Sequence, residues 1–298
     1  MNLSIIVPCY NECESIDEFY AEMINSLKEE KITYELIFID DGSSDDTLIK
    51  LKEISKKNKN VKIISFSKNF GKEAAMLAGL ENSSGKYISI IDADMQQLPK
   101  TLLEMYKKLI DNTEYDVVAA YREKRGNDGS LKTLLTPIFY RIMNKTSEVS
   151  LLPGASDFRV FKSCVKDAII SLPERSRFLK GMFSWVGFNT IYVPYEPDNR
   201  KYGESKWSLL NLIKYAIGGI VSFSIFPLAV VFIIGLFMFL IAFLNLLFND
   251  LGIKTVIFFI SLNGLMIGII SLYLIRMYKN SLSRPIYIIK EKIGFKSN

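Results

Sequence analysis

The sequence contains no histidine, and this absence excludes several kinds of chemistry at once. Without an imidazole there is no Ser-His triad, no histidine-ligated zinc hydrolase and no histidine general base. Any reaction that the chain catalyses must therefore use carboxylates, cations, hydroxyls, amides or a bound metal.

Cysteine is scarce as well. The three cysteines, Cys9, Cys13 and Cys164, are an odd number and too few for a disulfide framework. Such a set favours free thiols in a reducing compartment. No second pair of ligands follows Cys9 and Cys13, so we do not expect a zinc site.

A strong excess of one charge is also missing. The 37 basic and 32 acidic residues give a net charge of +5, which is too small to indicate nucleic-acid binding. A mild basic excess beside apolar segments fits an anionic membrane surface better. The N-terminus has no basic segment and only a short apolar run, so we expect no signal peptide and a cytosolic N-terminal domain.

Two long apolar runs lie near the end of the chain, at Ile225–Phe248 and Thr255–Ile275. Each is long enough to cross about 30 Å of hydrocarbon, which predicts a transmembrane hairpin rather than two buried helices of a soluble protein. Basic residues flank its outer ends, whereas the connector 249–254 carries one lysine and one aspartate. The positive-inside rule therefore predicts that both termini are cytoplasmic.

The first third of the chain alternates short apolar runs with helical patterns. The expected strands are Leu3–Val7, Leu36–Ile39, Val61–Ser65, Tyr87–Ile91 and, further on, Val117–Tyr121. The expected helices are one that ends at Glu30 and begins with a capping box of Ser15 and Glu18, followed by Thr47–Lys57, Lys72–Glu81 and Leu102–Leu109. This alternation predicts a parallel, Rossmann-like α/β sheet with its ligands at the carboxyl ends of the strands.

Two amphipathic segments follow, at 131–145 and 207–222. Each carries a helical stripe of apolar residues with lysine or arginine among or beside them. One interpretation is a pair of core-facing helices, and the other is a pair of helices in the membrane interface. The second segment leads directly into the apolar spans, which favours the interfacial interpretation for it.

Acidic residues follow several of the predicted strands. Asp92 and Asp94 come directly after Tyr87–Ile91, where carboxylates are well placed to hold Mg²⁺ or Mn²⁺, although a solvated turn has the same pattern. Asp41 follows the second strand and could accept from a base or a ribose, or cap a turn. Tyr10 and Glu12 follow the first strand, where they could contact a base and a sugar hydroxyl. Lys68 and Lys72 follow the third strand and could contact phosphate.

Taken in order, these segments resemble the signature of the family-2 glycosyltransferases with the GT-A fold. The segments that carry this resemblance are Pro8–Glu12, Asp40–Ser43, Asn69–Ala74 and Asp92–Gln96. Further segments resemble the bacterial polyprenyl-phosphate glycosyltransferases, which are relatives of dolichol-phosphate mannose synthase. These are Asp157–Arg159, Pro173–Glu174, Arg177–Phe178, Trp185–Gly187, Arg200–Lys206, Ser222–Ser224 with Pro227–Leu228, and Arg284–Tyr287.

The resemblance implies a role for individual residues. Asp92, Asp94 and Gln96 would surround the metal and the diphosphate, with Asp94, Asp157 and Arg200 as the catalytic set. The nucleotide-sugar would contact Pro8, Tyr10, Glu12, Asp41, Lys72, Asp92 and Lys206, and the lipid phosphate would contact Arg122 and Arg141. One departure is visible, because this chain has Gln97-Leu98-Pro99 where the family usually has Asp-Pro-Pro.

The implied activity is the inverting transfer of a hexose from a nucleotide-sugar, UDP-glucose first, to undecaprenyl phosphate, with Mg²⁺ or Mn²⁺ as cofactor. N-acetylglucosamine or mannose as the sugar, a diacylglycerol acceptor, and a non-catalytic nucleotide-sugar-binding scaffold are the alternatives. A processive polysaccharide synthase would need more membrane spans and a Gln-x-x-Arg-Trp motif, and the sequence has neither. The expected location is the bacterial cytoplasmic membrane, with the product serving the cell envelope, and a homo-oligomer, possibly a tetramer, is expected.

The expected organisation has four parts. Residues 1–206 form a cytosolic GT-A domain and 207–222 an interfacial helix. Residues 225–276 hold two transmembrane helices, at 225–248 and 255–275, and 277–298 form a basic cytosolic tail.

Overall fold

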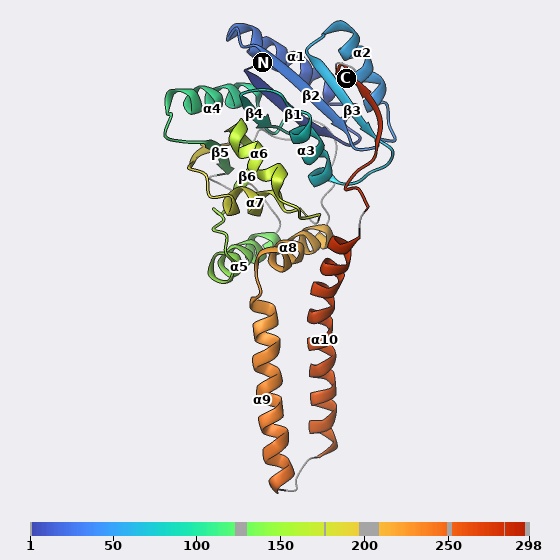
Figure 1. Cartoon of the computed structure of the whole chain (residues 1–298), viewed down its shortest axis with the longest axis vertical. Coiled ribbons are helices and arrows are strands. Elements are labelled where there is room, and N and C mark those ends of the chain that lie inside the picture. The colour runs from blue at the N-terminus through green and yellow to red at the C-terminus, as the bar shows by residue number, and fades with distance from the viewer. Residues whose placement is uncertain are drawn as a thin grey trace.

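The computed structural model describes residues 2–122, 130–175, 177–196, 209–248, 252–282 and 284–295. Figure 1 shows an α/β domain joined to a hairpin of two long helices, with a pair of shorter helices lying across the junction. The strands are β1 (Leu3–Cys9), β2 (Tyr34–Asp40), β3 (Val61–Phe66), β4 (Tyr87–Ile90), β5 (Val117–Arg122), β6 (Ala155–Lys162), β7 (Thr190–Tyr195) and β8 (Ile289–Ile293). The helices are α1 (Ile16–Glu29), α2 (Thr47–Lys57), α3 (Lys72–Glu81), α4 (Pro99–Asp111), α5 (Ser130–Thr146), α6 (Ser163–Ser171), α7 (Leu179–Trp185), α8 (Leu209–Phe223), α9 (Phe226–Phe248) and α10 (Ile253–Ser281).

The eight strands form one mixed sheet in the order β7-β5-β6-β4-β1-β2-β3-β8. The first four strands in sequence run parallel, as the sequence predicts. The strands that follow make the sheet mixed, because β6 is antiparallel to β4 and β5, and β8 is antiparallel to β3. The result is a GT-A-like α/β domain with two long apolar C-terminal helices.

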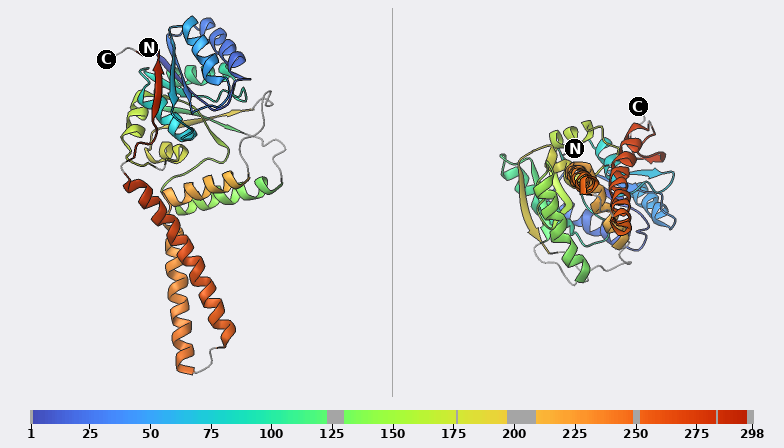
Figure 2. Two further views of the ribbon diagram at one scale, coloured as in Figure 1. Left: turned by 90° about the vertical axis from the view of Figure 1, so that its right-hand side faces the viewer. Right: turned by 90° about the horizontal axis from the view of Figure 1, so that it is seen from below.

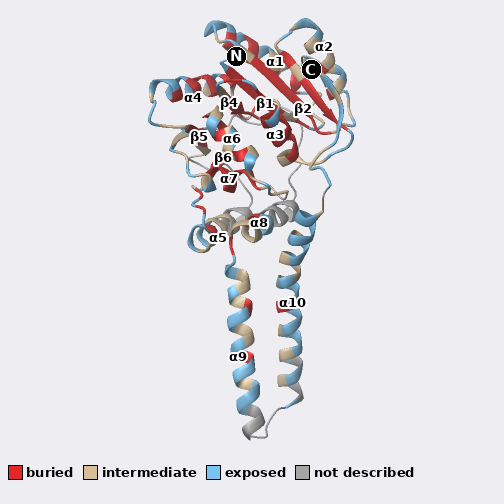
Figure 3. Cartoon of the chain, viewed as in Figure 1, coloured by how far each residue is buried: buried red, intermediate tan, exposed pale blue. Residues whose placement is uncertain are grey.

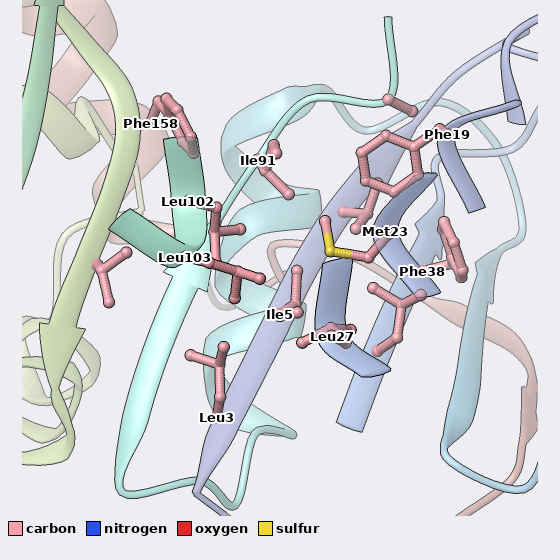
Figure 4. Close-up of a cluster of buried hydrophobic side chains, with 14 of the residues drawn as sticks. Leu3, Ile5, Phe19, Met23, Leu27, Phe38, Ile91, Leu102, Leu103 and Phe158 are labelled. Carbon is pink, nitrogen blue, oxygen red and sulfur yellow. The ribbon is translucent and has the colours of Figure 1, made fainter. Parts of the chain in front are cut away.

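Each face of the sheet buries its own hydrophobic cluster, because successive side chains of a strand point to opposite faces. One cluster packs β1 and β2 against α1, α2 and α4, and includes Ile5, Phe19 and Phe38 (Figure 4). The other packs the opposite face against α3, α6 and α7. Figure 3 shows the buried residues concentrated in this domain. The sheet is thereby rigid enough to position the loops at its carboxyl edge.

Helix α3 lies very close to β1, and Gly79 makes this possible. A Cβ atom at Gly79 would lie 2.2 Å from Ile6 Cγ2 in the buried strand. We expect Gly79→Ala to destabilise the domain by about 1–3 kcal/mol, since the overpacking outweighs the gain in helix propensity. Gly218→Ala, a helical position with nothing within 4 Å of the added atom, is the matched control. Thermal unfolding in detergent should show a lower midpoint for Gly79→Ala alone; equal midpoints would contradict this packing.

The predicted capping box at the start of α1 is wrong. Ser15 precedes the helix, but its side chain makes no capping bond to a helix N–H. Its hydroxyl instead donates to the carbonyl oxygen of Glu12 at 3.2 Å. The Ser15 hydroxyl thus bonds to the turn that follows β1 instead of capping α1.

Helices α5 and α8 lie side by side beneath the α/β domain (Figure 2). Met143 on α5 and Phe178 above the pair are buried in one small cluster, against which Ile220 and Phe223 of α8 pack. Other apolar side chains, such as Ile142 and Ile217, stay exposed. One face of the pair is therefore packed against the protein, and the placement of the other face in a membrane interface stays a prediction.

Helices α9 and α10 carry the two apolar windows, Phe226–Leu244 and Phe258–Ser281. Only 6% of the residues in each window are buried, so these are not core helices of the α/β domain. Their long uncovered apolar surfaces indicate association with a membrane. Helix α10 continues past the predicted end at Ile275, so that Arg276 and Lys279 lie in its last turns.

The C-terminal segment 277–298, expected as a basic cytosolic tail, supplies the end of α10 and a strand of the sheet. After α10 the chain returns to the sheet and pairs as β8 with β3. Tyr287 stacks on Phe66 with ring centroids 4.9 Å apart. The hairpin is thus held by the α/β domain at both of its ends.

Candidate active site

The carboxyl ends of the parallel strands β1 to β4 meet at one edge of the sheet, and hydrogen bonds join the loops that follow them. The Asn11 backbone N–H donates to Ser43 Oγ at 3.0 Å, and the Asn11 side-chain oxygen accepts from the Ser44 N–H at 2.8 Å. Gly42, at φ +67°, lets the second loop approach the third, because a Cβ there would lie 2.4 Å from the Lys68 carbonyl carbon. These contacts bring the first three loops together at this edge of the sheet.

Asp92, Asp94 and Gln96 are partly exposed, whereas the residues between them are buried. The three predicted metal-site side chains therefore keep some exposed surface in this turn, whereas their neighbours pack into the domain. Asp94 Oδ1 accepts from the Gln96 N–H at 3.1 Å, and the Gln97 amide nitrogen donates to Asp92 Oδ2 at 3.2 Å. Gln97, which the sequence marks only as a departure from the family pattern, therefore positions Asp92.

Lys72, in the first turn of α3, joins two of the predicted carboxylates. Its Nζ lies 2.6 Å from Asp92 Oδ1 and 3.7 Å from Asp157 Oδ2, which reaches the site from β6. Burial alone would lower the pKa of Lys72, but the two carboxylates raise it above its ordinary value. Lys72 thus remains a cation at neutral pH. It connects α3 to Asp92, which follows β4, and to Asp157 on β6.

Asp157 is held as a carboxylate by the cations around it. Burial acts to raise its pKa, but Lys180 and then Lys72 lower it below the usual value. Lys180 lies on α7, a helix that the sequence did not predict, so this contribution was missed. The positive residues face one carboxylate from two helices that are far apart in sequence.

Asp41 is buried and bonds to the segment directly before Lys72. Its carboxylate accepts from the Phe70 N–H at 2.6 Å and from the Gly71 N–H at 2.9 Å. Burial raises the pKa of Asp41 to about 6, and these two hydrogen bonds oppose the rise. Asp41 therefore positions Phe70 and Gly71, the two residues that precede Lys72, and its contact with the nucleoside stays a prediction.

The residues predicted to hold the lipid phosphate lie in different places. Arg122 ends β5, where its guanidinium donates to the Tyr195 hydroxyl at 3.3 Å and to Gln96 Oε1 at 3.5 Å. Arg122 therefore lies in the same site as Gln96. Arg141 is exposed on α5, beneath the domain.

The remaining predicted contacts lie at the rim or beyond the described residues. Tyr10 is 38% exposed, which leaves its ring open for stacking, and Pro8 and Glu12 are partly buried beside it. The Glu12 N–H donates to Thr47 Oγ1 at 2.8 Å. Arg200 and Lys206 lie outside the part of the chain that the structure describes.

The donor set fits a hard divalent cation. Two carboxylates and an amide are oxygen ligands, and Mg²⁺ sites commonly combine one or two carboxylates with substrate phosphates. Within the described residues no group of three acidic or thiol side chains forms a closed metal cage. The arrangement therefore suits a cation that is shared with a diphosphate rather than one held by the protein alone.

Comparison with known proteins places the chain in a family. Residues 4–165 match the glycosyl transferase family 2 model. The bactoprenol glucosyl transferase of Shigella phage SfV is 35% identical over 98% of this chain and 99% of its own length. CsbB of Bacillus subtilis (strain 168) is 39% identical over 97% of this chain and 91% of its own length. The chain belongs to glycosyl transferase family 2 and is a glycosyltransferase.

Solved structures support the fold. Glucosyl-3-phosphoglycerate synthase from Mycobacterium tuberculosis, in complex with UDP, is similar with a TM-score of 0.51 and 17% identity over 74% of this chain and 79% of its own. The same enzyme with Mn²⁺, UDP-glucose and phosphoglyceric acid gives a TM-score of 0.50 and 18% identity, over 74% and 77%. At this identity the likeness establishes the GT-A-like fold alone.

Lys72 is expected to matter for turnover because it is the cation between Asp92 and Asp157. We expect Lys72→Met to lower kcat/KM for glycosyl transfer about 10- to 100-fold, the equivalent of one charge-assisted hydrogen bond. Lys56→Met, at an exposed position in the last turn of α2, is the control. Equal kcat/KM values for the two variants would show that Lys72 has no role in the reaction.

Proposed function

We propose that this chain transfers a hexose, with UDP-glucose as the favoured donor, to undecaprenyl phosphate. The observation that carries the proposal is the meeting of Lys72, Asp92 and Asp157 at the carboxyl edge of a family 2 domain. The chain leaves this domain to form an apolar hairpin and then returns to pair with the edge of the sheet. The bactoprenol glucosyl transferase relatives, similar over nearly the whole chain, support the same acceptor and sugar.

The donor side of the site would hold the nucleoside diphosphate. Asp92, Asp94 and Gln96 would bind Mg²⁺ or Mn²⁺, which would neutralise the leaving diphosphate when bound. Lys72 is close enough to Asp92 to contact the same phosphates. Tyr10, Glu12 and Pro8 would contact the nucleoside from the rim, together with Asp41 if its loop rearranges on binding.

The acceptor needs little activation. A phosphate monoester has its second pKa at about 6 and is mostly dianionic at neutral pH, so it is already a nucleophile. This suits a chain that has no histidine. The main tasks of the protein are positioning and charge neutralisation, with Arg122 beside Gln96 placed to orient the acceptor phosphate.

The chemistry is one displacement at the anomeric carbon. A phosphate oxygen of the lipid would form the new bond as the bond to the nucleoside diphosphate breaks, which inverts the configuration. Asp157, kept ionised by Lys180 and Lys72, would orient the sugar or the acceptor. Arg200 and Lys206 would meet the diphosphate or the lipid phosphate, and Arg141 on α5 would guide the lipid headgroup from below.

The membrane placement follows from the same features. The hairpin would cross the bacterial cytoplasmic membrane with both ends and the catalytic domain in the cytoplasm, and α5 and α8 would lie at headgroup level. A homo-oligomer, possibly a tetramer, remains a prediction that the mass of the purified protein in detergent would test. N-acetylglucosamine or mannose as the sugar and a diacylglycerol acceptor are the outcomes that compete with the proposal.

Transfer of radiolabelled sugar tests the proposal. Purified protein with Mg²⁺ or Mn²⁺ is given undecaprenyl phosphate and a panel of UDP- and GDP-linked sugars. We expect label in the lipid phase with UDP-glucose and loss of this label when the metal is chelated. Label with a different donor alone would change the sugar, and label-free lipid with every donor would refute the polyprenyl-phosphate acceptor.

A further inference from the structure

A second charged site lies at the junction between α10 and the catalytic domain. A cavity of about 250 Å³ opens there, many times the roughly 10–15 Å³ that one water needs. Its charged lining consists of Arg175, Arg177, Lys279, Arg284 and Glu73. Four of these residues are cations and one is a carboxylate, and Glu174 and Glu81 also act on Arg177. The lining itself keeps a positive excess, which favours an anionic ligand.

The cations differ in how firmly they are held. The Arg177 guanidinium donates to the carbonyl oxygens of Ile169 at 2.7 Å and Leu172 at 3.3 Å, so it forms a fixed wall. Arg175 donates to the carbonyl oxygen of Arg284 and holds the link to β8 in place. Lys279 and Arg284 are exposed, so their charged ends are available to a ligand. The cavity thus combines a rigid basic wall with two accessible cationic side chains.

The cavity is separate from the active site, although both touch the first turn of α3. Lys72 reaches Asp92 and Asp157, whereas the adjacent Glu73 lines the cavity and accepts from the Leu179 N–H at 3.0 Å. Phe70 forms another part of the cavity wall. A ligand here would therefore contact the segment that carries Lys72 without entering the site of transfer.

The position of the cavity indicates where its anion comes from. Lys279 lies in the last turn of α10, at the end of the apolar window Phe258–Ser281. Below it the large side chains of Leu274, Met277 and Tyr278 are 56%, 67% and 63% exposed. A lipid whose chains lie along this surface would bring its headgroup phosphate to the level of Lys279, where cations end a membrane span.

We propose that this cavity, lined by Arg175, Arg177, Lys279 and Arg284, binds the phosphate of an anionic phospholipid headgroup, separately from the lipid that accepts the sugar. The site would hold the end of α10 and the first turn of α3 against one headgroup. The inference rests on the membrane placement of the hairpin and is independent of which sugar or acceptor the enzyme uses.

Lipid retention by the full-length protein tests this proposal. Protein is extracted from vesicles of phosphatidylcholine and phosphatidylglycerol, and native mass spectrometry identifies and quantifies the lipids that stay bound. We expect enrichment of phosphatidylglycerol, weakened about fivefold for each cation removed, so that the double variant Lys279→Gln with Arg284→Gln loses most of it. The double variant Lys100→Gln with Lys290→Gln removes the same charge from exposed positions outside the cavity and should retain it.

Three results would overturn the proposal. The first is equal retention of the two lipids by the wild type, and the second is equal loss in both double variants. The third is a different ligand. Inorganic phosphate could raise the unfolding midpoint in detergent only when Lys279 and Arg284 are present, or polyprenyl phosphate could be the only lipid whose retention depends on these two residues. The unfolding midpoint of each variant shows whether it is folded, and nucleotide-sugar binding reports on the transfer site separately.

Discussion

Asp94→Asn should reduce sugar transfer about 100- to 1000-fold while leaving the fold unchanged. Asp94 Oδ1 accepts from the Gln96 N–H at 3.1 Å, and the oxygen of an asparagine can accept the same bond. The substitution therefore removes the negative charge and keeps the loop geometry. Loss of an electrostatic group that acts on the developing charge costs a factor of this order in other enzymes.

The comparison that isolates the charge uses Asp111→Asn, at the exposed end of α4, as its control. Transfer rate and the Mn²⁺ concentration that gives half-maximal rate are measured for the wild type and both variants. We expect the Asp94 variant to lose rate and to need more metal, and the Asp111 variant to match the wild type. Full activity with unchanged metal dependence in Asp94→Asn would exclude this carboxylate from the metal-side machinery.

Glu35→Ala should cost about 3–5 kcal/mol of stability, the range measured for breaking a buried ion pair. Glu35 is fully buried in β2, where Lys62 Nζ and Ser4 Oγ each lie 2.5 Å from its carboxylate and the Ser84 N–H donates at 2.6 Å. The network joins β1, β2, β3 and the turn before β4. Its loss leaves Lys62 and Ser4 without their buried acceptor.

The same network gives a pH dependence with a defined sign. Burial acts to raise the pKa of Glu35, but the hydrogen bonds from Lys62, Ser4 and Ser84 lower it below the ordinary value of 4.5. The stability that the carboxylate provides is therefore complete above pH 4.5 and is lost as the pH falls through its lower folded-state pKa.

Denaturant unfolding at neutral and acid pH checks both statements. Glu29→Ala, an exposed glutamate on α1, provides the control, and we expect it to behave like the wild type. The cost of Glu35→Ala should shrink at acid pH, since the wild type then loses the same interaction. A cost that is small at neutral pH, or that does not change with pH, would contradict the network.

The sequence predicts the first half of the sheet well because its strands are local and apolar. Each of β1 to β4 is buried on both faces, so a short apolar run marks it. β6 is harder to predict, because Asp157 and Arg159 interrupt its apolar pattern. Arg159 is nevertheless buried, with its guanidinium 4.4 Å from the centre of the Phe183 ring. Only the folded protein supplies the partner that makes this charge acceptable inside a strand.

β8 could not be predicted from its own residues. Its sequence Ile-Lys-Glu-Lys-Ile is mostly charged, which is typical of a solvated tail. It forms because it pairs with the edge of β3 after the chain has passed through α9 and α10, and because Glu291 meets Lys52 at 2.7 Å. These contacts join segments more than two hundred residues apart, so no local pattern reports them.

The candidate site shows the same division. The motifs single out Asp92, Asp94 and Gln96, whose role at a metal stays a prediction. The ion pairs of Lys72 with Asp92 and Asp157, and the effect of Lys180 on Asp157, arise only when α3, β6 and α7 are packed together. Sequence motifs thus identify the residues, and tertiary packing decides their partners.

A competition between acceptors tests the central claim most directly. The enzyme is given UDP-glucose and vesicles that hold undecaprenyl phosphate, undecaprenol and diacylglycerol together, and the glycosylated lipid is identified by its mass. The account predicts that undecaprenyl phosphate alone gains a hexose, because its phosphate is the nucleophile. A hexose on diacylglycerol or on undecaprenol, with undecaprenyl phosphate unchanged, would contradict it.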